Sequence, residues 1–182
     1  MIIERKWAMP NRHTFLIKPI QNFVLAEIAG KDVVVDPFSG YNSPATVTND
    51  LNPDAPTDYH MDAIEFLRSF GDNSVDCVIV DPPYSPRQIA ECYRAIGKQV
   101  TATDTQNGAY ISKIRDEVAR ILVHGGKVIM CGWNSNGIGK TRGFVMNRIL
   151  VCAHGGSHND TIVTTETKVQ QSLYTYHSSP ER

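Results

Sequence analysis

SVDCVIVDPPYS, residues 74–85, is an apolar run that stops abruptly at two prolines. A strand exposed on one face would alternate apolar and polar residues, so this run predicts a strand buried on both faces. KDVVVDPFSG at 31–40 is a second run of this kind and also ends at Asp-Pro. Because such strands occur in sheets covered by helices on both sides, the two segments predict an α/β protein with a mainly parallel sheet.

The rest of the chain supplies the other elements of such a sheet. Apolar residues at helical spacing predict helices over 18–30, 63–70, 86–97 and 108–126. Further strands are expected over 45–53, 58–63, 127–133, 144–154 and 160–169. The last two flank a glycine-containing turn and therefore predict an antiparallel C-terminal hairpin.

The composition is that of one soluble domain. Of the 182 residues, 41% are hydrophobic and 20% are charged, which argues against disorder. We expect a core over residues 13–169 and a polar tail over 170–182. No apolar run is long enough to span a bilayer, and the charged N-terminus lacks the apolar stretch of a signal peptide. The four cysteines show no CxxC spacing and predict free thiols, which indicates a reducing, cytoplasmic setting.

The formal net charge of −1 hides an uneven distribution. Residues 36–84 contain nine acidic residues and one basic residue, whereas residues 85–182 contain twelve basic and seven acidic residues. The nearly neutral total therefore does not exclude a polyanionic partner for the second half of the chain.

Four aspartates stand where predicted strands end: Asp36, Asp50, Asp62 and Asp81. The carboxyl ends of parallel strands meet at one edge of the sheet, which is where ligands bind. Aspartate also caps turns and helices, and this is the alternative explanation for any one of the four. Their recurrence at four strand ends favours a functional site at this edge.

Six motifs carry a family resemblance. They are FLIKPI (15–20), VVVDPFSG (33–40), TNDLNP (48–53), MDAIEF (61–66), VIVDPPY (78–84) and HGGKVIMCGW (124–133). In this order they resemble the DPPY-type amino methyltransferases, which use S-adenosylmethionine to methylate exocyclic amines of nucleic-acid bases. The resemblance implies a Rossmann-like methyltransferase sheet.

The resemblance also implies a set of residues that bind S-adenosylmethionine. The set is Lys18, Asp36, Pro37, Phe38, Gly40, Asp50, Leu51, Asp62 and Ala63. In the family's pattern Asp50 takes the ribose hydroxyls, Asp62 the adenine amine and Lys18 the carboxylate. A solvated lysine at a helix start is the alternative for Lys18. The acidic character of residues 36–84 suits a cofactor that carries a sulfonium.

The implied catalytic residues are Asp81, Pro82, Pro83 and Tyr84. The N6 amine of adenine is a poor nucleophile, because its lone pair is delocalised into the ring. The Asp81 carboxylate and the Pro82 carbonyl can accept hydrogen bonds from this amine as it becomes tetrahedral. Tyr84 offers a flat face to the base, which must leave the stack if the substrate is a duplex. In this family, aspartate rather than serine at the first position favours adenine over cytosine.

The chain departs from the family's pattern in its crossovers. Between the strands at 31–40 and 45–53, and again after Asp50, too few residues remain for a crossover helix. We therefore expect reduced helices on one face of the sheet, a face that the helix at 18–30 cannot cover alone. A second copy or an obligate partner subunit would then bury this face, most simply as a homodimer.

Nucleic acid is the expected partner. The motifs leave no room between them for a domain that reads sequence, so contacts should come from basic loops. The residues expected at phosphate are Arg87, Lys140, Arg142 and Arg148. A solvated basic surface is the alternative. Cys152, His154 and His158 have metal-ligand spacing, but no fourth ligand is evident and we expect no metal site.

The expected activity is methyl transfer from S-adenosylmethionine to N6 of adenine in DNA (EC 2.1.1 class). RNA is an alternative substrate. Two other functions stay open: an inactive methyltransferase-like partner subunit, and an enzyme that uses S-adenosylmethionine for another reaction. The intact DPPY segment argues against both. The resemblance implies a cytoplasmic enzyme encoded by a bacterium or a phage.

Overall fold

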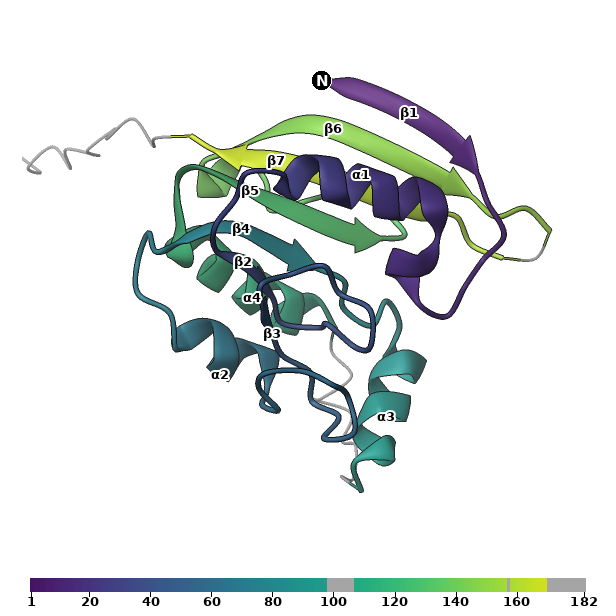
Figure 1. The fold of residues 1–182 in the computed structure, drawn as a ribbon, viewed down its shortest axis with the longest axis horizontal. Coiled ribbons are helices and arrows are strands. Elements are labelled where there is room, and N and C mark those ends of the chain that lie inside the picture. The colour runs from purple at the N-terminus through teal and green to yellow at the C-terminus, as the bar shows by residue number, and fades with distance from the viewer. Residues whose placement is uncertain (98–106, 157, 170–182) are drawn as a thin grey trace, which may run out of the picture.

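The computed structural model describes residues 1–97, 107–156 and 158–169 and contains one seven-stranded sheet (Figure 1). Its strands are β1 (Ile2–Trp7), β2 (Val34–Asp36), β3 (Val47–Thr48), β4 (Val75–Val80), β5 (Leu122–Gly132), β6 (Phe144–Ala153) and β7 (Thr161–Lys168). They lie in the order β1-β6-β7-β5-β4-β2-β3. All neighbours are parallel except β7, which is antiparallel to both β5 and β6. This confirms the predicted α/β fold with its antiparallel C-terminal hairpin.

Helices pack on both faces of the sheet. They are α1 (Lys18–Ile28), α2 (Ala63–Arg68), α3 (Pro86–Ala95) and α4 (Asn107–Ile121), with 3₁₀ turns η1 (Thr14–Leu16) and η2 (Lys140–Arg142). One face is covered by α1 and η1 and the other by α2 and α4, so two apolar cores lie back to back across the strands (Figure 1). None of the helices in the described ranges has the length and apolar character needed to cross a membrane.

The sheet face beneath α1 is not bare, so the prediction that this helix cannot cover it is wrong. Six side chains on this face are at most 2% exposed within a single chain: Val34, Cys77, Ile79, Ile129, Cys131 and Val163. None is larger than isoleucine, so one helix can lie close to the strands, and Phe15 from η1 joins the same core. No second copy is needed to bury this face, and the homodimer stays a prediction.

In the described chain, the crossover between β2 and β3 contains no helix, as its length predicts, and the chain after β3 contains none before α2. A buried amide takes over part of the missing packing. Asn49 is fully buried, and its Nδ2 donates to the carbonyls of Pro37 and Met61 at 3.1 and 3.0 Å. Its Oδ1 accepts from the N–H of Met61 at 3.0 Å. One side chain thus ties the turn after β2 to the segment that leads into α2.

Three elements differ from the sequence prediction. The edge strand β1 is absent from the prediction, because it is mostly exposed and has no regular apolar pattern. The strand expected over 58–63 is a single bridge between Asn49 and Tyr59, since Asp62 already caps α2. The helix expected to reach residue 126 ends at Ile121, because the two glycines at 125–126 belong to an irregular stretch of β5.

A network of charges joins α1 to three strands. Glu27 of α1 is 6% exposed, and its carboxylate contacts Lys127 Nζ of β5 at 2.7 Å and Arg148 Nη1 of β6 at 2.6 Å. Arg148 also pairs with Glu4 of β1 and lies 4.5 Å from the centre of the Phe23 ring. Burial raises the pKa of Glu27, but the hydrogen bonds from the two cations outweigh it and leave the pKa below its usual value.

We expect Glu27→Gln to lower the free energy of unfolding by about 2–4 kcal/mol at pH 7, because two cations lose their buried counter-charge. In the wild type this contribution is present above the usual glutamate pKa and is lost as the pH falls through the lowered one. Urea unfolding between pH 3 and 7 measures both effects. Glu65→Gln, on the exposed side of α2, is the control. Equal stability of Glu27→Gln and wild type at pH 7 would contradict this role.

Candidate functional site

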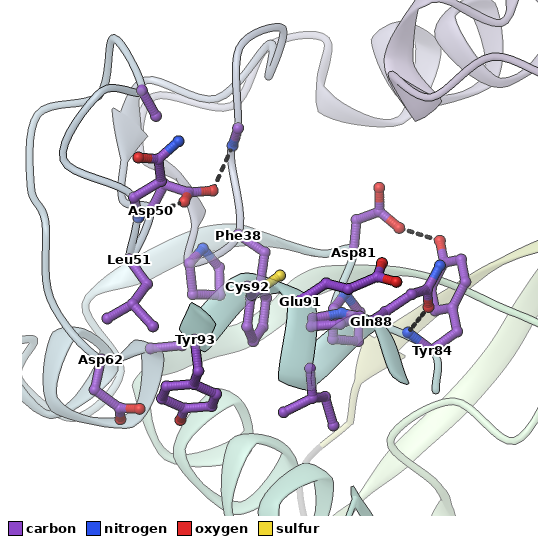
Figure 2. Close-up of a pocket in the computed structure, with 18 of the residues that line it drawn as sticks. Phe38, Asp50, Leu51, Asp62, Asp81, Tyr84, Gln88, Glu91, Cys92 and Tyr93 are labelled. Atoms are coloured by element: carbon purple, nitrogen blue, oxygen red, sulfur yellow. Dashed lines mark hydrogen bonds between the residues drawn. The ribbon is translucent and has the colours of Figure 1, made fainter. Parts of the chain in front are cut away.

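A cavity of about 440 Å³ opens at the carboxyl ends of β2, β3 and β4 (Figure 2). This is the edge at which the sequence places its four aspartates. The walls come from the turns after these strands, the start of α2 and one side of α3. The lining residues include Pro37, Phe38, Gly40, Asp50, Leu51, Asp62, Ala63, Asp81, Pro82, Pro83, Tyr84, Gln88, Ile89, Cys92 and Tyr93. The structure therefore brings together all four residues of the DPPY segment and seven of the nine residues expected at the cofactor.

Asp50 and Asp62 lie at one end of this cavity, away from Asp81 and Tyr84 (Figure 2). The Asp50 carboxylate accepts hydrogen bonds from two backbone N–H groups in the adjoining turns, at 2.9 and 2.8 Å. The Asp62 carboxylate caps α2 through one oxygen, at 2.8 Å, and accepts from the Tyr110 hydroxyl through the other, at 3.2 Å. Each carboxylate oxygen has a second lone pair. Both groups are thus fixed in place and can still accept hydrogen bonds from a ligand.

Asp36 ends β2 but is not among the residues that line the cavity. It is fully buried, and its two oxygens accept from the Phe38 N–H at 2.8 Å and from the Ser43 hydroxyl at 2.6 Å. Burial raises the pKa of Asp36 to about 7, and the negative charges of Asp81 and Asp50 act in the same direction. Asp36 therefore holds the turn whose residues line the cavity.

The DPPY segment follows β4 directly. The Tyr84 hydroxyl donates a short hydrogen bond to Asp81 Oδ1. Burial raises the pKa of Asp81, and hydrogen bonds from Tyr84 and Thr14 partly oppose the rise. Gln88 Oε1 accepts from the Tyr84 N–H at 2.7 Å and, through a capping box with Ser85, starts α3. The segment is therefore held between the end of a buried strand and a capped helix.

A second cavity, of about 130 Å³, shares only residues 82–84 with the first. Its other walls come from α4, from the end of β5 and from the loop that follows: Ile111, Arg115, Met130, Cys131, Gly132, Trp133, Asn134 and Gly137. The ring centres of Trp133 and Tyr84 are 5.6 Å apart, with an interplanar angle of 56°. Residues 82–84 thus form a wall between a larger cavity and a smaller one with aromatic sides.

The loop beside the second cavity is held by a buried carboxylate. Glu166 of β7 is 2% exposed and accepts hydrogen bonds from the N–H groups of Ile138 and Gly139, the latter at 3.2 Å. Gly137 has a φ of +57°, and a Cβ at this position would collide with the Glu166 carboxylate. Only glycine meets both conditions, so Gly137 and Glu166 together set the path of the loop.

The four basic residues expected at phosphate fall into two groups. Arg87 is exposed on α3, and its surface ion pair with Glu91, one turn along the helix, contributes little to stability. Lys140 is exposed in η2. Arg142 instead pairs with Asp116 of α4 at 2.7 Å, and Arg148 belongs to the network around Glu27. Arg87 and Lys140 are therefore the two whose side chains stand in solvent.

Two further sequence features lie outside the cavities. Lys18 is exposed at the start of α1, where its Nζ donates to Gln21 Oε1 at 2.8 Å, and it does not line the larger cavity. His154 is buried, and its ring nitrogens contact a backbone carbonyl and the Thr161 hydroxyl, both at 2.9 Å. Within the described ranges, no three His, Cys, Asp or Glu side chains are placed to hold a metal ion.

Four contributors to the site are absent from the sequence prediction: Asn49, Tyr110, Arg115 and Glu166. Glu166 could have been noticed in the sequence, because it is the one charged residue in the interior of β7 and a buried charge needs a specific partner. Asn49 gives a weaker indication, as a polar residue at a strand end. Tyr110 and Arg115 lie on an amphipathic helix, and its periodicity cannot show which polar residue faces a cavity.

No family model matches this sequence, and no curated protein is detectably similar to it. The fold, in contrast, is the Rossmann-like fold of methyltransferases of known structure. One is the 1,6-didemethyltoxoflavin-N1-methyltransferase of Burkholderia thailandensis, solved with S-adenosylhomocysteine (TM-score 0.54, 10% identity, 84% of this chain and 78% of that one). A second is the precorrin-6y C5,15-methyltransferase of Geobacter metallireducens (TM-score 0.54, 14% identity, 88% and 94%).

TrmN from Thermus thermophilus has the same fold, with a TM-score of 0.52 and 17% identity over 83% of this chain. The chain spans about half of the length of TrmN, 49%. At these identities the likeness is one of fold.

We expect the contribution of Asp36 to the free energy of unfolding to fall as the pH rises from about 4 to 7, because Asp36 stays protonated when folded but ionises when unfolded. For this group the change amounts to at most about 4 kcal/mol. Asp36→Asn keeps an acceptor for the Phe38 N–H and removes the titration, so its stability should fall less. Urea unfolding at pH 5 and 8 measures the difference, with the exposed Asp54→Asn as control. Identical pH dependence in Asp36→Asn and wild type would contradict the assignment.

Gly137→Ala should destabilise the protein by about 1–3 kcal/mol, because it adds a Cβ at positive φ and against the Glu166 carboxylate. Gly71→Ala is the matched control, since that glycine has open space around it and no positive φ. Thermal unfolding measures the loss. If both variants are as stable as the wild type, the contact between Gly137 and Glu166 does not hold the loop.

Proposed function

We propose that this chain transfers a methyl group from S-adenosylmethionine to the N6 amine of adenine in DNA. One observation carries the proposal: Pro82, Pro83 and Tyr84 form the wall between two cavities, with Asp81 beside it in the larger one. Transfer between two bound molecules requires the reacting atoms to lie about 3–3.5 Å apart in a fixed orientation, and the shared residues mark the place where ligands of the two cavities come closest. The methyltransferase fold and the DPPY motif support the same activity.

The larger cavity suits S-adenosylmethionine in size and in charge. Its described lining residues include the acidic Asp50, Asp62 and Asp81 and no lysine or arginine, which favours a cationic ligand. Asp50 would hold the ribose hydroxyls and Asp62 the adenine amine, both at the end away from Asp81 (Figure 2). When bound, the cofactor supplies an electrophilic methyl group on a sulfonium. A neighbour in fold, the Burkholderia enzyme, was solved with S-adenosylhomocysteine, which supports this choice.

The acceptor amine would lie at the wall between the cavities. The Asp81 carboxylate and the Pro82 carbonyl accept hydrogen bonds from its two N–H groups, which localises the nitrogen lone pair. The raised pKa of Asp81 makes this carboxylate a better proton acceptor than an ordinary aspartate, so it can take the proton that the amine loses. Tyr84 and Trp133 offer flat surfaces to the base.

The proposed substrate is DNA, from which the target base must be turned out of the duplex. Arg87 and Lys140 are exposed and can meet phosphate. Aspartate at the first position of the motif favours adenine over cytosine.

The decisive experiment incubates the protein with labelled S-adenosylmethionine and separate pools of duplex DNA, single-stranded DNA and RNA. We expect label in 6-methyladenine of DNA, and roughly a 10²–10³-fold or larger loss in Asp81→Ala. Asp81→Ala should still bind the cofactor by calorimetry, whereas Asp50→Ala should bind it more weakly. The exposed Glu65→Gln is the control.

Each other outcome revises a stated part of the proposal. Label in RNA alone would replace DNA as the substrate. Cofactor binding without transfer to any pool would favour an inactive partner subunit. Absence of cofactor binding would remove the methyltransferase function altogether.

A further inference from the structure

Arg115 of α4 lines the smaller cavity, and no hydrogen bond or ion pair joins its guanidinium to the rest of the described chain. Its Nε atom is buried without a hydrogen-bond partner, and no described carboxylate lies within ion-pair distance of the side chain. A buried donor without an acceptor costs free energy, and nearly all such groups in proteins are satisfied. Because Arg115 lines the cavity, a ligand bound there can accept from the terminal amino groups of the same guanidinium.

The charged neighbours of Arg115 do not provide this acceptor. Glu166 acts on it electrostatically, but both oxygens of that carboxylate accept from backbone N–H groups of the adjoining loop. Arg142 adds a second positive charge nearby and is itself paired with Asp116. The positive charge at Arg115 therefore favours an electron-rich hydrogen-bond acceptor in the cavity.

We propose that Arg115 donates a hydrogen bond to a ring nitrogen of the target base and so determines which base presents its amine to Asp81. This inference rests on the proposed function. Adenine suits the arrangement, because its ring edge carries only acceptor nitrogens, N1, N3 and N7. Guanine carries an N–H donor at N1 directly beside its exocyclic amine, and a guanidinium cannot accept from it. Cytosine, like adenine, carries an acceptor nitrogen beside its amine, so the contact selects against guanine. The aromatic rings of Trp133 and Tyr84 hold a planar base, and Arg115 supplies the polar contact that sets its rotation within that plane.

The position of Arg115 also suggests why a half-buried cation without an ion-pair partner in the described chain stands there. A cation removed in part from water without an ion pair lowers stability, so a purely structural role would leave it paired. Arg120, on the same helix, shows the paired case: it bonds Asp72 at 2.7 Å and Glu117 at 2.8 Å. Arg115 differs from it in facing a cavity.

The test compares wild type and Arg115→Met on oligonucleotides whose target adenine is replaced by 1-deaza-, 3-deaza- or 7-deazaadenine. In the wild type, at least one replacement should lower kcat/KM roughly 10- to 100-fold beyond its effect in the variant, because the donor then loses its acceptor. A ring substitution that changes the reactivity of the amine itself lowers kcat/KM equally in both proteins, so it cancels when the two are compared. Lys113→Met removes an exposed charge from the same helix and should behave as wild type. Arg115→Met should unfold at the same temperature as wild type or higher, whereas a structural arginine would give a loss.

The outcomes separate this inference from the function on which it rests. If wild type methylates adenine but each deaza base has the same effect in both proteins, the inference is overturned and the function stands. If, in addition, Arg115→Met reduces the salt dependence of binding, a phosphate contact replaces the base contact. If wild type transfers no methyl group to adenine, the proposed function fails and the inference fails with it.

Discussion

Burial of β4 on both faces is the constraint on which the site depends. Val75, Cys77, Val78, Ile79 and Val80 are all fully buried, some beneath α1 and others beneath α2 and α4. Sliding the strand by one residue would exchange the two sets of side chains, so its register is strongly specified. Because Asp81 is the next residue, the packing that buries Val80 also places Asp81 at the edge of the sheet. The prolines that follow then stop the strand at that point.

The short strands β2 and β3 end at the same edge of the sheet, and no helix lies between them in the described chain. Nor does a helix lie between β3 and the start of α2, where every residue is described. The turns are held instead by hydrogen bonds that Asp36 and Asp50 accept and that Asn49 donates. Polar groups can replace apolar packing here because nearly every buried one has a partner. The arrangement gives Asp50 two tasks: it fixes a turn and it faces the cavity. Asp36 has the first task only, and its raised pKa is the cost of full burial.

The two cavities on either side of residues 82–84 are built from different kinds of structure. On the side of the larger cavity, short turns at strand ends carry carboxylates. On the side of the smaller cavity, α4 and the loop after β5 meet, and Glu166 reaches from β7 to bind that loop through its backbone. The loop therefore depends on a residue distant in sequence. The sheet therefore sets the shape of this loop and its position next to the DPPY segment.

The prediction from sequence was most successful where local patterns suffice. Apolar runs located β2 and β4, and the short connection between β2 and β3 excluded a helix there. Strand ends located Asp36, Asp50 and Asp81, whereas Asp62 caps α2. It failed for β1, whose residues are exposed, and for the face under α1, whose cover depends on side-chain size rather than on the number of helices. The smaller cavity and the position of Arg115 in it were not predictable, because they result from contacts between segments far apart in the chain.

The amino-acid sequence by itself determined the α/β sheet, the antiparallel hairpin and the edge at which the DPPY segment stands, because periodicity and chain length restrict these directly. The tertiary structure alone decided that one helix covers a whole face, that Asp36 supports the cavity without lining it, and that Arg115 faces a second cavity. These features depend on how side chains from different elements fill a common space, and no single segment of the chain contains that information.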